Sequence, residues 1–561
     1  MRFALPDRRR PFGPVLLELD LSRGVVETPS AAPLRIVGAR PAPTLHALLT
    51  ALRQAERDRH VAGLVAHVAQ RPISLALSSE LRDAVGRFRR SGKAAVAWTE
   101  SFGELGVGNV GYHLATAFEE IWLQPSGDVG LTGVVARAVF VRDALDRLGV
   151  EPQLAQRHEY KTAADTFLRS EMSDAGREMA RRLAESATET IVADVAAARG
   201  LDPATVREIV DHAPLTATEA LEAGLVDRLG YRDEVYASLR SRLGDVRLLY
   251  VERYGRRRER GRAVRRAVAG RSSPVVALVR ASGPIHLGHS SSVPWGGPNV
   301  GSDTLGATLR AAGRDPAVKA VVLRVDSPGG SYVASDAIRR EILALRGSGR
   351  PVIASMATVA ASGGYYIAMP CDVVVASPTT LTGSIGVLAG KQVVKEALGR
   401  VGVRIDSEAV GAHAEMFSSQ QPFTEEEWAR LEGWLDEVYD DFTSKAAADR
   451  GMPVERLRDV ARGRVWTGAD ARSHDLVDQL GGLEEAVAIA CERAGVGRDD
   501  VDVRVLPQAG LVRRLRGPES SEHAAAAHTA GQQPLLDGAL AALGLPLASG
   551  VLTMPVTWEL S

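Results

Sequence analysis

Two segments of the chain carry the same pattern, and this duplication limits the possible folds more than any other feature. Residues 110–134 (VGYHLATAFEEIWLQPSGDVGLTGV) align with residues 363–387 (GGYYIAMPCDVVVASPTTLTGSIGV) without a gap, at an offset of 253 positions. Residues 220–235 match residues 471–486 in the same order along the chain. Repeats of this length in a chain of 561 residues predict two related domains rather than one large core.

Each half alternates short apolar runs with helical patterns. In the second half, AVVLRV and PVIASM have the length and β-branched content of buried strands, and ASDAIRREILALRGSG has helical periodicity. A longer helical pattern, EEEWARLEGWLDEVYDDFTSKAAADRG, comes later and predicts a helical hairpin. Strands that alternate with helices form βαβ units with parallel pairing and right-handed crossovers. The sequence therefore predicts a tandem duplicated α/β fold.

We expect five segments along the chain. They are an N-terminal tail, a first repeat, an arginine-rich linker, a second repeat and a low-complexity flexible tail, over residues 1–11, 12–255, 256–272, 273–505 and 506–561. The arginine-rich stretch is typical of a solvated linker or an exposed helix, and the alternative is a patch for anionic lipid headgroups. The last segment is rich in Ala, His, Gln and Ser, as disordered segments are.

Composition excludes several classes of protein. The net charge of −1 gives no overall attraction to nucleic acid or to a membrane. Two cysteines, Cys371 and Cys491, are too few for a disulfide framework. No apolar run approaches the ~20 residues that span a bilayer, and the N-terminus does not have a signal-peptide pattern. Metal-binding and phosphate-binding motifs are absent, so we expect no metal and no cofactor.

The aligned copies act as internal controls for functional residues. Ser362 falls opposite Asn109, and Lys161 falls opposite Ala414. Each half has therefore lost a residue that the other half keeps, which is the pattern expected of one site built from both halves. A packing serine and a solvated lysine are the alternative interpretations of the two residues taken singly.

Serine and lysine together suit nucleophilic chemistry. A serine hydroxyl is a weak nucleophile that needs an adjacent base. Lysine can be that base if burial lowers its pKa from ~10.4 toward neutrality, whereas arginine stays protonated. The chain has six lysines and sixty-two arginines, so Lys161 stands out. A Ser-His-Asp triad that uses His413 is the competing arrangement, and His158 lies close to Lys161 in the sequence.

A glycine turn supplies candidate hydrogen-bond donors for an oxyanion. In LRVDSPGGSYVASDAI a strand ends, Gly329 and Gly330 turn the chain, and Ser331 is a candidate N-cap for the helix that follows. An ordinary turn between strand and helix is the alternative. The corresponding segment of the first half, VAQRPISLALSS, lacks the glycine pair. In LTGSIGV, Ser384 falls opposite Leu131 and is a candidate hydrogen-bond partner for the lysine.

Four motifs together resemble the signal peptide peptidase A family (protease IV) in its long, duplicated form. They are EYKTAAD (159–165), DSPGGS (326–331), ASGGYYIA (361–368) and LTGSIGV (381–387). The resemblance implies Clp protease/crotonase-like domains with layered β-sheets and flanking helices.

The resemblance also implies roles for individual residues. Ser362 would be the nucleophile and Lys161 the general base. The amides of Gly330 and Gly363 would form the oxyanion hole, and Ser384 would orient the lysine.

The family further implies a substrate and partners. The expected substrates are signal peptide remnants or other apolar peptides, and the expected assembly is a homo-oligomer, a tetramer in long members. The resemblance implies a membrane-associated protein, but no anchor is visible in the sequence. The chain is then cytoplasmic or in peripheral membrane contact. A crotonase-like acyl-CoA enzyme and an inactive scaffold of the same fold are the alternatives, and the dyad requires that Lys161 reaches Ser362.

Overall fold

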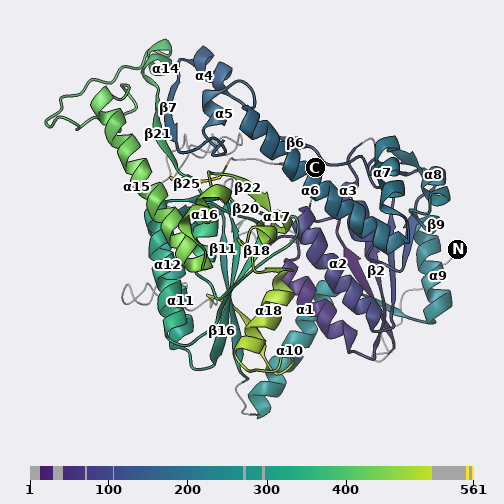
Figure 1. Cartoon of the computed structure of the whole chain (residues 1–561). Helices are drawn as coiled ribbons and strands as arrows, with labels where there is room; N and C mark the ends of the chain where they lie inside the picture. Colours follow the sequence, from purple (N-terminus) through teal and green to yellow (C-terminus); the bar gives the residue numbers. More distant parts are fainter. Residues whose placement is uncertain are drawn as a thin grey trace.

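The body of the molecule consists of two sheets, one from each repeat, with helices on both sides (Figure 1). The computed structural model describes residues 13–28, 42–69, 73–104, 106–269, 273–293, 297–507, 551–554 and 559–560. The N-terminal tail expected over residues 1–11 lies outside these residues.

The first sheet is entirely parallel. Its strands, in spatial order, are β10 (Arg247–Tyr250), β1 (Val15–Asp20), β2 (Val61–His67), β3 (Ala94–Thr99), β4 (Glu120–Leu123) and β9 (Arg228–Leu229). The helices of this repeat are α1 (Leu45–Glu56), α2 (Leu75–Arg90), α3 (Asn109–Ala115), α6 (Asp174–Arg199), α7 (Pro203–His212), α8 (Ala217–Glu222) and α9 (Arg232–Leu243). A short antiparallel pair, β5 (Asp128–Val129) with β8 (Leu215–Thr216), completes it.

The second sheet repeats this plan. The strands along its main path are β24 (Asp502–Leu506), β11 (Val275–Ser282), β16 (Val318–Ser327), β18 (Val352–Ala361), β20 (Leu381–Gly383) and β22 (Val465–Thr467). Strands β19 (Val373–Ala376) and β23 (Gln479–Leu480) extend it from β18, and only the pair of β20 with β22 is antiparallel. The helices of this repeat are α11 (Ser302–Arg314), α12 (Tyr332–Gly347), α13 (Gly363–Ala368), α16 (Val454–Val460), α17 (Gly468–Ser473) and α18 (Leu483–Arg493).

The elements predicted from the sequence of the second repeat are confirmed. AVVLRV lies in β16, PVIASM enters β18 at its second residue, Val352, and the predicted N-cap, Ser331, accepts a hydrogen bond from the amide of Ala334. Both strands have almost wholly buried side chains, as expected of central strands covered on two faces. Short strands beside this sheet are β12 (Ile285–His286), β13 (Ser292–Val293), β14 (Gly297–Pro298), β15 (Val300–Gly301) and β17 (Gly329–Gly330).

Equivalent hydrogen bonds in the two repeats confirm the duplication. The hydroxyl of Tyr112 donates to the carbonyl of Leu225 (2.8 Å), and the hydroxyl of Tyr365 donates to the carbonyl of Leu476 (3.1 Å). The tyrosines are 253 positions apart and the leucines 251, the offsets of the two aligned segments. Each tyrosine lies on the short helix that follows the third core strand. The fold is therefore a tandem duplicated α/β fold, as predicted.

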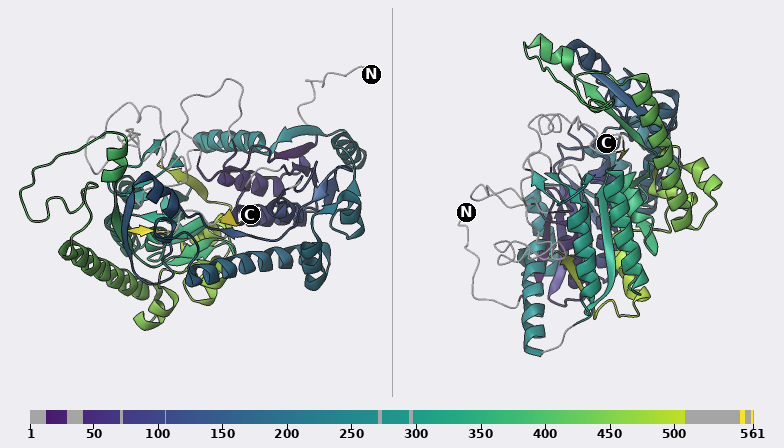
Figure 2. Two further views of the ribbon diagram at one scale, coloured as in Figure 1. Left: turned by 90° about the horizontal axis from the view of Figure 1, so that it is seen from above. Right: turned by 90° about the vertical axis from the view of Figure 1, so that its left-hand side faces the viewer.

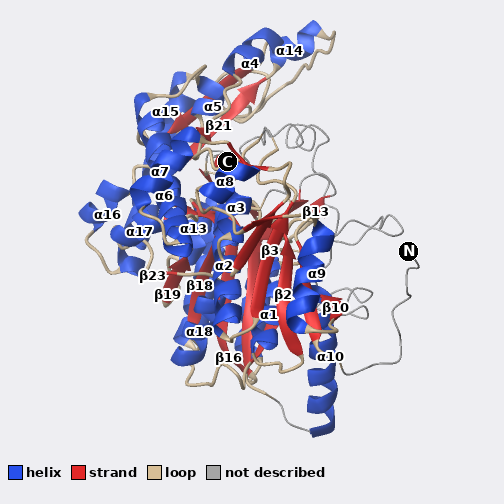
Figure 3. Ribbon diagram, turned by 90° about the vertical axis from the view of Figure 1, so that its right-hand side faces the viewer, coloured by secondary structure: helices blue, strands red, loops and turns tan. Residues whose placement is uncertain are grey.

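A buried ionic cluster joins the repeats. Arg324, on β16, donates to the carboxylates of Glu27 and Glu80 from the first repeat. Glu80 also accepts from the amide of Leu483, at the start of α18 (2.7 Å). All three charged side chains are buried, and the strands and helices of both repeats share one apolar core around them. Figure 3 shows the strands of both sheets between their helical layers.

An arm built from both repeats projects from the body (Figure 2). Strand β7 (Glu151–Gln156) of the first repeat pairs antiparallel with β21 (Leu388–Val393) of the second, so that Leu388 lies opposite Gln156. The helices of the arm are α4 (Arg142–Leu148), α5 (Asp165–Leu168), α14 (Lys395–Arg400) and the long α15 (Glu425–Arg450). The segment predicted to be a helical hairpin forms this one continuous helix, so the prediction of a hairpin there is wrong. The chain leaves β7 toward the body, and this connection carries Lys161.

The arginine-rich segment is helical, one of the two forms expected for it, and two short strands lie within the expected tail. The arginine-rich segment belongs to a helix, α10 (Val251–Ala269), which packs on α1 through Tyr254, whose hydroxyl donates to Asp58 (2.9 Å). Within the segment expected to be a flexible tail, β25 (Leu552–Thr553) pairs with β17, and β26 (Glu559–Leu560) pairs with β6 (Ala136–Arg137). Backbone pairing, which composition does not reveal, fixes both strands. Among the described residues, no helix is long and apolar enough to cross a bilayer.

Candidate active site

Ser362 lies at a strained turn between β18 and α13. It caps α13 with φ 55° and ψ −115°, a conformation that a non-glycine residue adopts only where the surroundings impose it. Its amide donates to the carbonyl of Gly383 on the neighbouring strand (2.8 Å). Gly364 is needed beside it, because a Cβ at that position would lie 2.4 Å from the carbonyl oxygen of Ser327. The turn therefore holds the serine hydroxyl in one place, with small neighbours.

The equivalent turn in the first repeat carries different residues. Asn109 stands where the second repeat has Ser362, and its side-chain amide donates to the carbonyl of Gly133 (2.6 Å). The residue that caps α3 is Gly108, with φ −105°. The first repeat thus uses the position for a hydrogen bond within its own fold.

Lys161 reaches this turn from the other repeat. Its Nζ lies 2.9 Å from Oγ of Ser362. The same nitrogen lies 3.0 Å from both the carbonyl oxygen and Oγ of Ser384. All three side chains are fully buried. The structure therefore brings together the two residues that the comparison of the copies singled out, and places the third predicted residue against the amine.

Burial alone sets the charge of this amine. Removal from water lowers the pKa of Lys161 well below its usual value, and among the described residues no carboxylate opposes this shift. A neutral amine has two N–H groups and one lone pair. The two oxygens of Ser384 match the N–H groups, and the hydroxyl of Ser362 can then donate to the lone pair. The geometry therefore suits a neutral amine that can accept the proton of the Ser362 hydroxyl.

Hydrogen bonds to the second repeat hold the segment that carries Lys161. The backbone amide of Arg157 donates to the carbonyl of Val387 (3.1 Å), and its guanidinium donates to Asp436 and to the carbonyl of Glu432 on α15. These contacts continue the β7–β21 ladder toward the body and fix the direction of the chain between the ladder and the lysine.

Gly463 completes the packing around the lysine and was not found from the sequence. It has φ 80°, and a Cβ there would lie 2.5 Å from both N and Cβ of Lys161. Gly386, kept in both copies, also lies close, since a Cβ at that position would be 3.2 Å from Cδ of Lys161. A search for chemically active side chains overlooks such glycines, because their function is to leave space.

Two backbone amides converge beside Ser362. Gly330 has φ 149°, and a Cβ there would lie 2.1 Å from the carbonyl oxygen of Ile285, so only glycine fits. An ideal Cβ on Gly363 would lie 3.1 Å from the amide nitrogen of Gly330, which places the two glycines against each other. Backbone N–H groups in this arrangement can stabilise a developing oxyanion.

Ser384 is held from outside the site. It also has a positive φ, 50°, and its amide donates to the carbonyl of Arg464 (2.6 Å). The guanidinium of Arg464 makes a two-point contact with Glu178 from the first repeat (2.9 and 2.7 Å). The position of Ser384 therefore depends on both repeats.

The candidate histidines lie elsewhere. The ring of His413, on the arm, lies 3.6 Å from Glu426 and 3.7 Å from Glu427. The ring of His158 packs against Tyr439, with 4.5 Å between ring centroids. The side chain hydrogen-bonded to the Ser362 hydroxyl among the described residues is Lys161. The geometry thus favours the lysine over a histidine triad.

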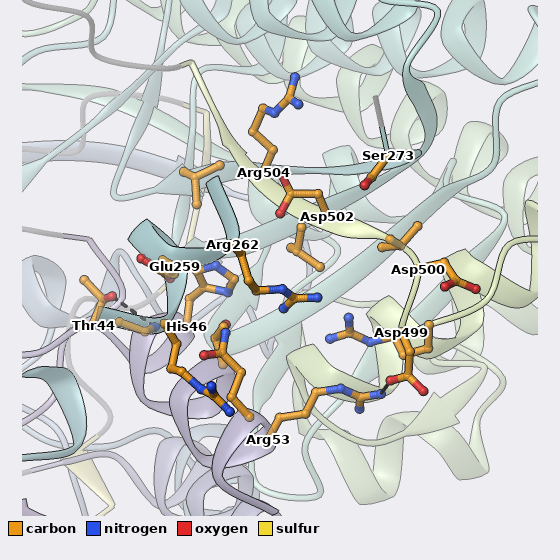
Figure 4. Close-up of a pocket in the computed structure, with 18 of the residues that line it drawn as sticks. Thr44, His46, Arg53, Glu259, Arg262, Ser273, Asp499, Asp500, Asp502 and Arg504 are labelled. Atoms are coloured by element: carbon orange, nitrogen blue, oxygen red, sulfur yellow. Dashed lines mark hydrogen bonds and ion pairs between the residues drawn. The ribbon is translucent and has the colours of Figure 1, made fainter. Parts of the chain in front are cut away.

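A separate cavity of about 1060 Å³ lies between the repeats, against α1, α10 and β24 (Figure 4). Charged side chains such as Arg53, Arg262, Asp499 and Arg504 line it, and Arg53 pairs with Asp499 (3.3 Å). None of its lining residues is a predicted site residue. Its walls carry charged side chains, some of them in ion pairs, beside apolar ones such as Val501 and Val503, and it is distinct from the Lys161–Ser362 site.

Comparison with known proteins identifies the family, and one family model matches the chain twice. The family model for peptidase family S49 matches residues 87–246 and again residues 344–497. The chain belongs to peptidase family S49. This S49 peptidase is 33% identical over 469 residues to "Protease 4" of Salmonella typhi, an alignment that covers 80% of this chain and 72% of the relative.

Two further relatives extend the comparison. The chain is 33% identical to "Serine protease SPPA, chloroplastic" of Arabidopsis thaliana, over 79% of this chain and 64% of the relative. It is 35% identical to "Putative signal peptide peptidase SppA" of Enterococcus faecium, over 32% of this chain and 52% of that relative. The chain is thus a serine peptidase with a tandem duplication, as the sequence predicted.

Proposed function

We propose that this S49 peptidase is an endopeptidase in which Ser362 attacks the peptide carbonyl and Lys161 accepts the proton of the serine. The observation that carries the proposal is the 2.9 Å contact between a fully buried amine and a hydroxyl on a strained turn. The lowered pKa of Lys161 supports its role as a base, since a neutral amine can accept a proton at moderate pH.

The reaction follows from the positions of these groups. As Oγ of Ser362 bonds to the carbonyl carbon, its proton moves to Nζ of Lys161, and the amides of Gly330 and Gly363 donate to the oxyanion. Lys161 then gives this proton to the leaving amine, and the C–N bond breaks to leave an ester on Ser362. Water attacks the ester with the same lysine as base, which releases the acid and restores the serine.

Ser384 orients the base. Its carbonyl and hydroxyl oxygens both accept from Nζ of Lys161, so the remaining lone pair of a neutral amine points at Ser362. We assign Ser384 as a positioning residue, since it contacts the lysine. Its own backbone is fixed by Arg464.

We propose apolar peptides as substrates, including signal peptide remnants. A buried apolar cluster adjoins the nucleophile turn and contains side chains of both repeats, among them Met179, Leu183, Ala361, Leu381 and Val465. Such a wall suits apolar side chains of a bound peptide. The name of the Enterococcus faecium relative points to the same class of substrate.

We further propose a homo-oligomer, a tetramer by analogy with long family members, in peripheral contact with a membrane. The arm supports an interaction role, because it exposes a series of apolar side chains: Leu148, Val401, Val403, Ile405, Val410 and Phe417. Light scattering after gel filtration tests the oligomeric state. Flotation with anionic vesicles tests the membrane contact. A monomer that stays away from vesicles would contradict both.

Hydrolysis of casein and of an apolar fluorogenic peptide tests the dyad. Wild type should cleave, and Ser362→Ala and Lys161→Ala should each lose activity while they keep the melting temperature and assembly of a folded protein. His413→Ala is the matched control and should keep activity. If Lys161→Ala stays active while Ser362→Ala is inactive, the base lies elsewhere. If wild type cleaves nothing and binds CoA, the acyl-CoA alternative replaces the proposal.

A further inference from the structure

The cavity between α1, α10 and β24 carries more positive than negative charge on its walls (Figure 4). Among the described residues, seven arginines and four carboxylates line its volume of about 1060 Å³, an excess of three positive charges. The first repeat supplies arginines from α1 and α10, and the second supplies them from β11, β24 and the turn before β24. The positive charge therefore collects at the boundary between the repeats.

Five of these arginines have a carboxylate partner within the protein. They form ion pairs with Asp58, Asp315, Glu484 and Asp499. The other two, Arg262 and Arg280, make no hydrogen bond or ion pair with any residue that the structure describes. Figure 4 shows the side chain of Arg262 extending from α10 into the cavity. These two guanidinium groups can therefore donate to a ligand.

Arg280 lies at the inner wall of the cavity. In the register of β11 with β16 it is the neighbour of Arg324, the arginine of the buried ionic cluster. Burial lowers the pKa of Arg280, Glu27 raises it and Arg324 lowers it again, but a guanidinium stays protonated. A positive charge that is partly removed from water and has no hydrogen-bonded carboxylate is stabilised by an anion beside it.

The first turn of α1 lies against the same cavity. Thr44, His46 and Ala47 line it, and the N-terminal end of a helix favours negative charge. Burial lowers the pKa of His46 to about 4, and Arg280 acts in the same direction. The ring is therefore neutral near pH 7 and carries one N–H, which donates to no described residue. This turn adds a further donor to the two arginines.

The size and the apolar part of the cavity indicate an organic ligand rather than a bare ion. Small-molecule sites commonly measure about 300 to 1,000 Å³, and this cavity is at the upper end of that range. Val501, Val503 and Val505 line it beside the charged groups. Guanidinium groups bind phosphate through two parallel hydrogen bonds. A phosphorylated organic molecule matches both kinds of wall.

We propose that this cavity is a binding site for an organic phosphate, with Arg262 and Arg280 on its phosphate groups and the valines against its organic part. A soluble phosphorylated molecule and a phospholipid headgroup share this chemistry. The proposal does not depend on peptidase activity, because none of the cavity residues belongs to the dyad site. Since both repeats contribute to the walls, a bound ligand also stabilises their association.

Calorimetric titration of the full chain with ADP and with pyrophosphate tests the site. At least one of them should bind wild type saturably, and Ser362→Ala should bind it equally well. Arg280→Gln and Arg262→Gln should each raise Kd about tenfold or more, the effect of losing a charge-assisted hydrogen bond. Arg262 is exposed on its helix, so that variant tests the site even if Arg280→Gln does not fold. The melting temperature of wild type should rise with ligand concentration.

Arg207→Gln is the matched control. Arg207 is exposed on α7, does not line the cavity, and its loss removes the same charge. This variant should bind the ligand as wild type does. If it weakens binding as much as Arg280→Gln and Arg262→Gln do, the ligand is attracted by overall charge and the proposed site is wrong.

Flotation with phosphatidylcholine vesicles that contain phosphatidic acid distinguishes the two sources of phosphate. Vesicle binding that is lost in Arg262→Gln and Arg280→Gln but kept in Arg207→Gln, without binding of the soluble probes, assigns the site to a lipid headgroup. Binding of ADP or pyrophosphate without vesicle binding assigns it to a soluble molecule. If no probe binds, or if the two cavity variants bind as tightly as wild type, the proposal is overturned.

Discussion

At the scale of single residues, Lys161 combines a cost in stability with a chemical use. An amine held without water and without a carboxylate partner resists protonation, which is why its pKa is lowered. The unfolded chain has no such restriction and takes up the proton below about pH 10.4. Between the folded pKa and that value the unfolded state binds more protons, so the burial of Lys161 destabilises the fold increasingly as pH falls.

The first prediction concerns Lys161→Met. At pH 7 this variant should have a higher free energy of unfolding than wild type, by about 1.4 kcal/mol for each unit of the lowering of the lysine pKa that lies above pH 7. The gain should shrink toward pH 10, where both states of the wild-type lysine are largely neutral. Thermal unfolding at the two pH values measures it, and a gain that is equal at both would contradict the account. Its kcat should fall by about 10² to 10⁴, the usual contribution of a general base.

The second prediction is a pH profile. Because the amine must be neutral to accept the serine proton, kcat/KM should rise with pH through the pKa of Lys161 in the free enzyme and then level off. Burial places this rise well below pH 10.5. Initial rates on one peptide across pH 5 to 10 locate the rise. A midpoint near the pKa of a solvated lysine would show that the base is not a buried amine.

At the scale of elements, the ladder of β7 with β21 determines where the lysine segment enters the body. Gly390 has φ 155°, and a Cβ there would lie 1.9 Å from the carbonyl oxygen of Gln153 on the opposite strand. The close approach of the two strands depends on this glycine. Displacement of β7 would move Lys161, which follows it by a few residues.

The third prediction compares two glycines of the arm. Gly390→Ala should lower kcat by about 10²-fold, the cost expected when a catalytic group is misplaced by about 1 Å. Gly399→Ala, on α14, is the matched control, since a Cβ there meets no atom within 4 Å. Kinetics of both variants on one peptide check the prediction. Equal rates would mean that the ladder does not position the lysine.

The sequence predicted the elements of each repeat better than the contacts between repeats. Apolar runs identified β16 and β18, because these signals are local. The glycine pair that was expected to turn the chain forms the short strand β17 instead, since it pairs with β12 and β25. The ladder of β7 with β21 escaped prediction, since periodicity shows that a segment can be a strand but not which partner it meets.

The candidate site shows the same limit. Comparison of the copies singled out Lys161 and Ser362, which lie 2.9 Å apart, and their catalytic roles stay predictions. Gly463 was not found, because it lies far from Lys161 in the sequence and only the folded chain brings the two residues into contact. Strand β25 was hidden in a segment whose composition indicated disorder, since four residues that dock change little in a count of residue types.

At the scale of the whole molecule, one buried arginine connects the repeats. Arg324 donates to Glu27 and Glu80, and all three side chains are excluded from water. Its pKa is raised by the two carboxylates, which keep it charged against its burial. Removal of the arginine leaves two carboxylates buried together without their hydrogen-bonded counter-charge, although the guanidinium of Arg280 still interacts with Glu27.

The fourth prediction follows from this cluster. Arg324→Ala should destabilise the fold by about 3 to 5 kcal/mol, the range for a buried pair that loses one partner. Activity should fall with it, because the base and the nucleophile belong to different repeats. Arg504→Ala is the control, since its partly exposed pair with Asp315 (3.6 Å) should contribute only about 0 to 1 kcal/mol. Chemical denaturation of both variants checks the difference.

The division of one site between two repeats also has a consequence in time. When the ribosome has made the first repeat, Lys161 is present but Ser362 has not yet been synthesised. The lysine therefore has no serine hydroxyl beside it for a further stretch of synthesis. Even then the lysine reaches the serine only after β7 has found β21 and Gly463 has closed over the lysine. A partly synthesised chain of this peptidase therefore cannot hydrolyse other proteins. Its activity begins only when the last parts of the fold assemble.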